Sequence, residues 1–179
     1  MSFDVEVSKL TLLEGGYTND PLDSGGETNF GVTKAVARAF GYEGAMSLMT
    51  REQAKMIYRK RYWDALYLDR IEAVAGAVAA EMFDTAVNMG TEVSGRFLQR
   101  CLNVLNQNGK MYADIQVDGR VGEMTIAALR EYMRNRGAAG AVVLLRGLNS
   151  LQGARYIELA ESRGKDERFV YGWLLNRVN

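Results

Sequence analysis

The stretch EGGYTNDPLDSGGETNFGVT, residues 14–33, sets one glutamate at the point where a helix must end and an acidic, hydroxyl-rich loop begins. Upstream of it, Phe3, Val7 and Leu10 recur at helical spacing and mark an inward-facing side. Glu14 continues this spacing, so we expect its carboxyl to be desolvated. The Gly-Gly pair that follows ends the helix and leaves Glu14 at the negative end of the helix dipole. Burial and dipole both favour the protonated carboxyl that a general acid requires.

The loop after this glutamate offers a second carboxylate. Asp20 and Asp23 lie in a segment punctuated by proline and glycine. Glycoside hydrolysis commonly uses one protonated acid and one ionised carboxylate, and a buried glutamate beside an exposed loop aspartate would meet this need. We therefore expect Glu14 and Asp23 to be the two carboxylates. The hydroxyls of Thr28 and Thr33 could hold the attacking water, and Asp20 and Thr33 are candidates for substrate binding. The alternative is a solvated helix end followed by aspartates that only shape turns.

The same stretch resembles the signature of the glycoside hydrolase family 108 N-acetylmuramidases, lysozyme-like enzymes of phage endolysins and of bacterial muramidases linked to secretion. Three further segments match, so the likeness covers nearly the whole chain: YWDALYLDRI (62–71), FDTAVNMG (83–90) and DGRVGEMT (118–125). The resemblance implies that Glu14 is the catalytic acid. By analogy with lysozymes generally, it also implies that Asp23 and Thr28 are the assisting pair.

The resemblance also implies the domain organisation. Beyond about residue 92 the chain resembles the family's peptidoglycan-binding part, whose DG-x-x-G-x-x-T pattern stands here at residues 118–125. We expect a mainly α protein, with a lysozyme-like catalytic domain at residues 1–92 and a helical peptidoglycan-binding region at residues 93–179. The proposed boundary lacks the proline and serine enrichment of a linker, so the two parts are expected to pack together.

Composition agrees with helices that end at glycines. The 179 residues include 19 glycines and one proline, and 47% are hydrophobic, which is enough for a core. Thr50 begins a capping box, and Cys101 lies on an apolar stripe that predicts a buried helix face. The expected helices span residues 32–40, from Thr50 to about 68, 74–89, 93–106, 123–135, 138–162 and 166–177, the last docking through Phe169, Val170, Trp173 and Leu174.

Three more residues are candidates for sugar binding. Tyr62 and Trp63 could stack on sugar rings, although aromatics in such a helix are more often core residues. Asn88 lies four residues after Asp84 on a predicted helix. The two could line a sugar groove or only hydrogen-bond a neighbouring loop.

The residue inventory excludes several chemistries. The chain contains no histidine and one cysteine, which excludes His-dependent zinc and Cys-His hydrolysis, Ser-His-Asp hydrolysis and an internal disulfide. The stretch 114–119 alternates acidic residues before a glycine, but the twelfth position of a calcium loop would be Thr125 instead of the required glutamate. We therefore expect neither a metal nor a cofactor.

Charge and hydropathy bear on partners and location. Residues 1–33 hold six acidic residues and one lysine, whereas residues 130–179 hold nine basic and five acidic residues, a balance that suits an anionic wall or simply solvated helix faces. Residues 59–63, RKRYW, point in different directions on a helix, so nucleic acid is not an expected partner. No apolar run approaches the roughly 20 residues of a membrane span. The N-terminus shows no Sec signal, so cytoplasmic synthesis and release through a holin pore or a dedicated export route are expected.

The leading hypothesis is an N-acetylmuramidase that cleaves the β-1,4 bond between N-acetylmuramic acid and N-acetylglucosamine in bacterial peptidoglycan, during phage lysis or wall opening for secretion. The alternatives are a lytic transglycosylase, which closes the sugar on itself instead of admitting water, and a non-catalytic peptidoglycan-binding protein.

Overall fold

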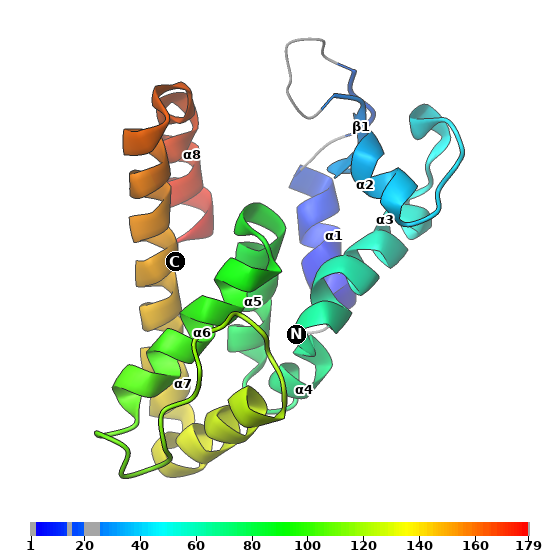
Figure 1. Cartoon of the computed structure of the whole chain (residues 1–179). Coiled ribbons are helices and arrows are strands. Elements are labelled where there is room, and N and C mark those ends of the chain that lie inside the picture. The colour runs from blue at the N-terminus through cyan, green and yellow to red at the C-terminus, as the bar shows by residue number, and fades with distance from the viewer. Residues whose placement is uncertain (1–2, 14–15, 20–25, 179) are drawn as a thin grey trace. The chain divides into compact units, whose positions relative to one another are not determined.

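The structure of this protein is a computed structural model that describes residues 3–13, 16–19 and 26–178 (Figure 1). The chain is mainly α-helical, as the sequence predicts, and forms two compact units, Met1–Asp64 and Ala65–Asn179. Within the described residues, no helix combines the length and the apolar character that crossing a bilayer requires.

The N-terminal unit is built around helix α1 (Phe3–Leu13). Its residues Phe3, Val7 and Leu10 are buried, which confirms the inward-facing side predicted from their spacing. The short strands β1 (Thr28–Asn29) and β2 (Val32–Thr33) form an antiparallel hairpin, followed by α2 (Lys34–Ala39), the 3₁₀ turn η1 (Met46–Leu48) and α3 (Arg51–Tyr58).

Helix α3 begins at the predicted capping box but does not continue as one α-helix to residue 68. Thr50 Oγ1 accepts from Gln53 N at 3.2 Å, and Thr50 N donates to Gln53 Oε1 at 2.9 Å. The chain then runs through the π-helical segment η2 (Arg59–Trp63) and the 3₁₀ turn η3 (Asp64–Leu66). Trp63 follows the buried Tyr58 by five residues, so the wider π turn brings its ring back to the buried face.

The C-terminal unit contains α4 (Leu68–Glu72), α5 (Gly76–Met89), α6 (Thr91–Leu105), α7 (Glu123–Ser162), the 3₁₀ turn η4 (Gly164–Asp166) and α8 (Glu167–Arg177). Within α7, Gly137 adopts φ 55° and ψ −148°, which breaks the helix where the sequence predicts two helices. Cys101 is buried on α6, and desolvation raises the pKa of its thiol to about 11.

Helix α8 folds back along the last part of α7 (Figure 1). The Trp173 ring stacks on Tyr156 with centroids 5.1 Å apart, and Leu174 lies over Gly153. Phe169 stacks on Trp173 at 5.9 Å but remains 44% exposed, so it covers the edge of this contact instead of entering the core.

A polar cluster joins α5, α7 and α8 beside this aromatic contact. Asp84 accepts from Arg177 at 2.7 Å and from Gln152 at 2.9 Å, and Gln152 also donates to Thr85 at 3.2 Å. Thr85 donates to Glu81 at 3.3 Å. Burial, with the charge of Asp84 as the smaller cause, raises the pKa of Glu81 to about 7. The folded protein therefore favours a protonated Glu81 well into the range where the unfolded chain ionises it.

This shift predicts that Glu81→Gln stabilises the protein at high pH. Because the folded pKa lies above the unfolded value, wild-type stability falls as the pH rises from about 4.5 through 7. The variant lacks this loss, so its free energy of unfolding should exceed that of the wild type by up to about 3 kcal/mol at pH 8 and by little below pH 4.5. Urea denaturation at both pH values measures this, with the exposed Glu161→Gln as control. A difference that is the same at both pH values would contradict the assignment.

Candidate active site and the wall-binding motif

The described part of the candidate active site is the base of a loop in the N-terminal unit, where Thr18 and Thr28 pair. Thr18 and Thr28 exchange two backbone hydrogen bonds of 2.9 Å each, and Thr28 is in turn the register partner of Thr33 in the hairpin. The chain positions of Asp20 and Asp23 fall between the two bridging threonines. These two aspartates and Glu14, which directly follows α1, lie outside the described residues.

The hairpin is held rigidly by groups outside it. Its turn residues, Phe30 and Gly31, have φ values of 49° and 73°, as a type I′ turn requires. A non-glycine residue in this conformation needs support from its surroundings. The Tyr58 hydroxyl donates a hydrogen bond to Phe30 O at 3.1 Å, and the Arg51 guanidinium lies over the Phe30 ring, 5.8 Å from its centroid. Asn29, 3% exposed, donates to Met46 O at 2.7 Å. The position of Thr28 is therefore fixed by the core below it.

The two candidate threonines, Thr28 and Thr33, have different hydrogen-bond partners. Thr28 Oγ1 donates to Gly26 O at 3.1 Å and accepts from Thr18 Oγ1 at 3.3 Å, so one of its two lone pairs has no partner among the described residues. That lone pair can accept from a water or a sugar hydroxyl. Thr33 Oγ1 instead accepts from Val36 N at 3.3 Å as the N-cap of α2, which the sequence analysis did not foresee.

Glu27 is a site residue that the sequence analysis missed. Lys34 donates to its carboxylate at 2.8 Å and Tyr17 at 3.0 Å. The hydrogen bond from Lys34, followed by that from Tyr17, lowers the pKa of Glu27, and the same Glu27 contact raises the pKa of Tyr17. The sequence gives little sign of this pair, because it depends on the hairpin register, in which extending Thr28↔Thr33 by one pair sets Glu27 opposite Lys34. An ionised carboxylate and an ammonium thus stand next to Thr28.

The remaining candidates occupy separate positions. Trp63 is 1% exposed, with the Phe3 ring meeting it edge-on at 5.3 Å, so it is a core residue and its faces are not available for sugar stacking. Tyr62 is half-buried in the N-terminal unit, with its ring 5.8 Å from that of Tyr58. Asn88 belongs to the C-terminal unit, where its exposed side chain donates to Asp84 O at 2.8 Å.

In the C-terminal unit, the DG-x-x-G-x-x-T motif is organised by one buried amide. Gln99, 1% exposed, donates to Asp118 Oδ1 at 3.0 Å and to Arg120 O at 3.0 Å, and its Oε1 accepts from Gly119 N at 2.8 Å. It also lies 3.4 Å from Thr125 Oγ1. Gln99, followed by Arg120 N, lowers the pKa of Asp118, so this carboxyl is ionised. The motif is therefore a hydrogen-bonded turn whose shape is fixed from α6.

Further amides, on α6 and at its C-cap, hold the irregular segment that leads into this turn. Asn103 donates to Ile115 O at 2.8 Å and accepts from Ile115 N at 2.9 Å, as a paired strand would. One turn on, Asn106 donates to Asp114 Oδ1 at 2.6 Å and to Tyr112 O at 3.2 Å. The hydrogen bonds that Asp114 and Asp118 accept thus come from within the same unit. In the part of the chain that the structure describes, no three histidine, cysteine or carboxylate groups lie close enough to share a metal ion.

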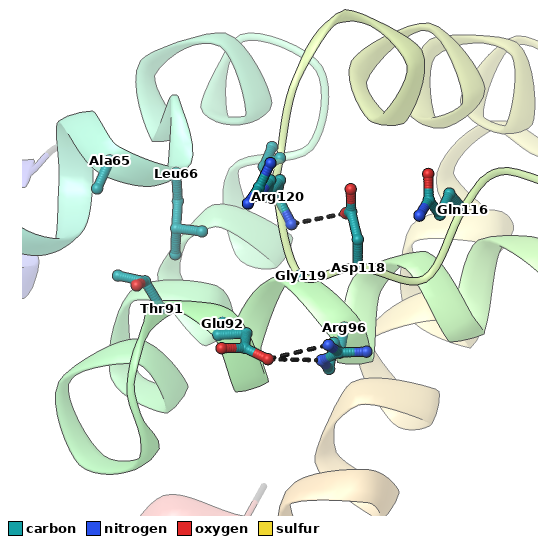
Figure 2. A pocket seen from close by; sticks show the side chains of 10 residues that line it. Ala65, Leu66, Thr91, Glu92, Arg96, Gln116, Asp118, Gly119 and Arg120 are labelled. Atoms are coloured by element: carbon teal, nitrogen blue, oxygen red, sulfur yellow. Dashed lines mark hydrogen bonds and ion pairs between the residues drawn. The ribbon is translucent and has the colours of Figure 1, made fainter.

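A polar pocket of about 680 Å³ opens between the first turn of α6 and this segment (Figure 2). Glu92 and Arg96 form an ion pair of 2.9 Å at one side, and Asp118 stands at the other. The lining residues are Ala65, Leu66, Thr91, Glu92, Arg96, Gln116, Asp118, Gly119, Arg120 and Val121.

Comparison with known proteins agrees with this arrangement. Residues 7–90 match the family model of glycosyl hydrolase 108, and residues 93–178 match a predicted peptidoglycan domain. Among solved structures, that of Brucella abortus SagA is similar in fold, with 22% sequence identity and a TM-score of 0.65 over 99% of this chain and 95% of that chain. No curated protein matches the sequence.

A helical hydrolase region joined to a wall-binding region defines the class of the protein. Residues 7–90 form a glycosyl hydrolase 108 region, and residues 93–178 form a predicted peptidoglycan domain. It is a glycoside hydrolase that acts on peptidoglycan. The compact units divide at Asp64 whereas the two matched regions meet between residues 90 and 93, so α4 and α5 belong to the hydrolase match in sequence and to the C-terminal unit in space.

The capping role of Thr33 predicts a structural cost of its removal. Thr33→Ala should lower the free energy of unfolding by about 1 kcal/mol, because Val36 N loses its acceptor at the start of α2. Thr33→Ser keeps the hydroxyl and should retain stability. Urea denaturation of both variants tests this, and equal stabilities of Thr33→Ala and the wild type would contradict it.

The close approach of α6 to the motif predicts a second sensitive position. A side chain on Gly95 would collide with the carbonyl oxygen of Gly119, so Gly95→Ala should cost about 1–3 kcal/mol of stability. Gly172→Ala is the matched control, because its side chain would enter open space on α8 and should be neutral or slightly stabilising. Thermal melting compares the two, and an unchanged melting temperature for Gly95→Ala would show that the contact is not close.

Proposed function

We propose that this peptidoglycan hydrolase is an N-acetylmuramidase that cleaves the β-1,4 bond between N-acetylmuramic acid and N-acetylglucosamine. The observation that carries the proposal is the buried face of α1. Phe3, Val7 and Leu10 are buried at a spacing that Glu14 continues, and residues 7–90 match glycosyl hydrolase 108. Glu14 is also close in sequence to the base of the loop, where Thr18 and Thr28 pair.

Glu14 is the proposed general acid, which protonates the departing glycosidic oxygen. The residue follows Leu13, the last of α1, so the carbonyl end of the helix dipole disfavours a negative charge at this position. Desolvation by the apolar face acts in the same direction. Both effects favour the protonated carboxyl, and transfer of that proton to the leaving group is the step proposed for Glu14.

Asp23 and Thr28 are the proposed assisting pair. Asp23, as an ionised carboxylate, acts as nucleophile or as base for the attacking water. The uncommitted lone pair of Thr28 supports its part, because a hydroxyl whose proton is already donated to Gly26 can only accept, and accepting one hydrogen of a water orients the water's oxygen. Asp20 and Tyr62 are proposed to bind the sugar.

The proposed catalytic domain spans residues 1–92 and the proposed peptidoglycan-binding domain spans residues 93–179. The matched regions, which end at residue 90 and begin at residue 93, support this division. Resemblance to endolysins and to secretion-linked muramidases supports a role in phage lysis or in opening the wall for secretion.

The test is mass spectrometry of fragments released from purified peptidoglycan by the wild type and by Glu14→Gln. The wild type should release fragments with reducing N-acetylmuramic acid ends, and the variant should be slower by about 10²–10⁴-fold with its fold intact. Glu43→Gln, an exposed glutamate of the same unit, is the matched control and should keep full activity.

Three outcomes would contradict the proposal. Near-normal rates for Glu14→Gln would show that Glu14 is not the general acid. Fragments with 1,6-anhydro ends would identify a lytic transglycosylase. No fragments from any of the proteins would identify a binding protein without activity.

A further inference from the structure

We propose that the polar pocket of the C-terminal unit binds the peptide stem of peptidoglycan, with Arg120 receiving a stem carboxylate. This inference rests on the proposed function in taking peptidoglycan as the substrate. It adds the place on the chain that recognises the wall and the part of the polymer that is recognised.

The first argument is the set of groups that the pocket leaves uncommitted. Arg96 is engaged on both sides, by Glu92 at 2.9 Å and by Val117 O at 2.6 Å. The exposed Arg120 guanidinium, in contrast, makes no hydrogen bond or ion pair with the residues that the structure describes. Its backbone is held by Asp118 at 2.8 Å and by Gln99 at 3.0 Å. Asp118 uses Oδ1 for its internal bonds, so Oδ2 faces no donor in the described chain. One cationic group and one anionic oxygen are thus available to a ligand.

The second argument is the chemistry of the lining. None of its ten residues, all of them in the described chain, is aromatic, so the pocket lacks the flat apolar platform on which sugar rings pack. Four of the ten are charged, two arginines and two carboxylates. The glycan of the wall offers mainly neutral hydroxyl and acetamide groups, whereas the stem offers free carboxylates and the amine of a diamino acid. Two carboxylates also make the pocket unfavourable for a polyanion.

The third argument is that the pocket is built before a ligand arrives. The buried Gln99 fixes residues 118–120 through three hydrogen bonds of 2.8–3.0 Å. Gly119 has φ 81°, and a side chain there would lie 2.6 Å from Glu92 Cγ, so the turn sits directly against the first turn of α6. A site whose backbone is already ordered loses little conformational entropy on binding. The volume of about 680 Å³ accommodates a short peptide.

The test measures binding of two soluble probes to the full-length chain by isothermal titration calorimetry. One probe is the disaccharide N-acetylglucosaminyl-N-acetylmuramic acid with its stem tripeptide. The other is the same disaccharide without the peptide, with its lactyl carboxyl capped as a methylamide so that it carries no free carboxylate. Neither contains the bond that a muramidase cleaves, so binding is read independently of hydrolysis. The peptide-bearing probe should bind and the bare disaccharide should bind at least about tenfold more weakly.

The variants locate the site. Arg120→Gln should weaken binding of the peptide-bearing probe by about tenfold, because a charge-assisted hydrogen bond is lost. Arg120→Lys keeps the charge and should recover part of the affinity. Arg146→Gln, an exposed arginine away from the pocket, is the matched control and should bind as the wild type does. Unchanged melting temperatures would show that each variant is folded.

Equal binding of the two probes, no binding of either, or normal affinity in Arg120→Gln would overturn the inference. These results are separate from the fate of the proposed function. If the chain hydrolyses peptidoglycan through Glu14 but binds both probes equally, only the proposed stem site is refuted. If the chain binds the stem through Arg120 but releases no fragments, only the proposed muramidase activity is refuted.

Discussion

Burial of the Trp63 ring is the constraint on which the N-terminal unit depends. The ring meets the edge of Phe3 at 5.3 Å, so it fixes where α1 begins against the rest of the unit. To reach that contact, the chain widens into a π turn directly after Tyr58, and it is Tyr58 that supports the strained Phe30 of the hairpin. The direction of α1 and the position of Thr28 therefore depend on neighbouring parts of the chain, the π turn and the last residue of α3 before it. π-helical turns are common where a functional site needs such an adjustment.

The C-terminal unit depends on side-chain hydrogen bonds that order an irregular segment. Between Leu105 and Glu123 it has a long stretch without regular secondary structure, whose backbone groups need partners. Amide side chains of Gln99 and Asn103 on α6 and of Asn106 at its C-cap supply them. Because an amide both donates and accepts, one side chain can satisfy an N–H and a C=O of the same residue, as Asn103 does for Ile115. The segment is thus ordered without a sheet.

Sequence reasoning succeeded where the determinant is local. The capping box at Thr50 lies next to the helix start that it stabilises, and apolar spacing located the buried faces of α1 and α6. It failed where the determinant is distant. The π turn is set by a tertiary contact of Trp63, and the capping use of Thr33 depends on how β2 enters α2. The pair of Glu27 and Lys34 required a hairpin register that two-residue strands scarcely signal. The roles of Glu14, Asp20 and Asp23 rest on sequence pattern and family.

The burial of Cys101 has a consequence for the settings in which the fold can persist. Its thiolate form, the one that reacts with oxidants and disulfides, is disfavoured because burial holds the thiol pKa near 11. The chain has no second cysteine with which to form an internal bridge. Its stability therefore owes nothing to thiol oxidation, and the same structure can persist unchanged in the reducing surroundings where proteins are made and in the oxidising surroundings where a cell wall is exposed.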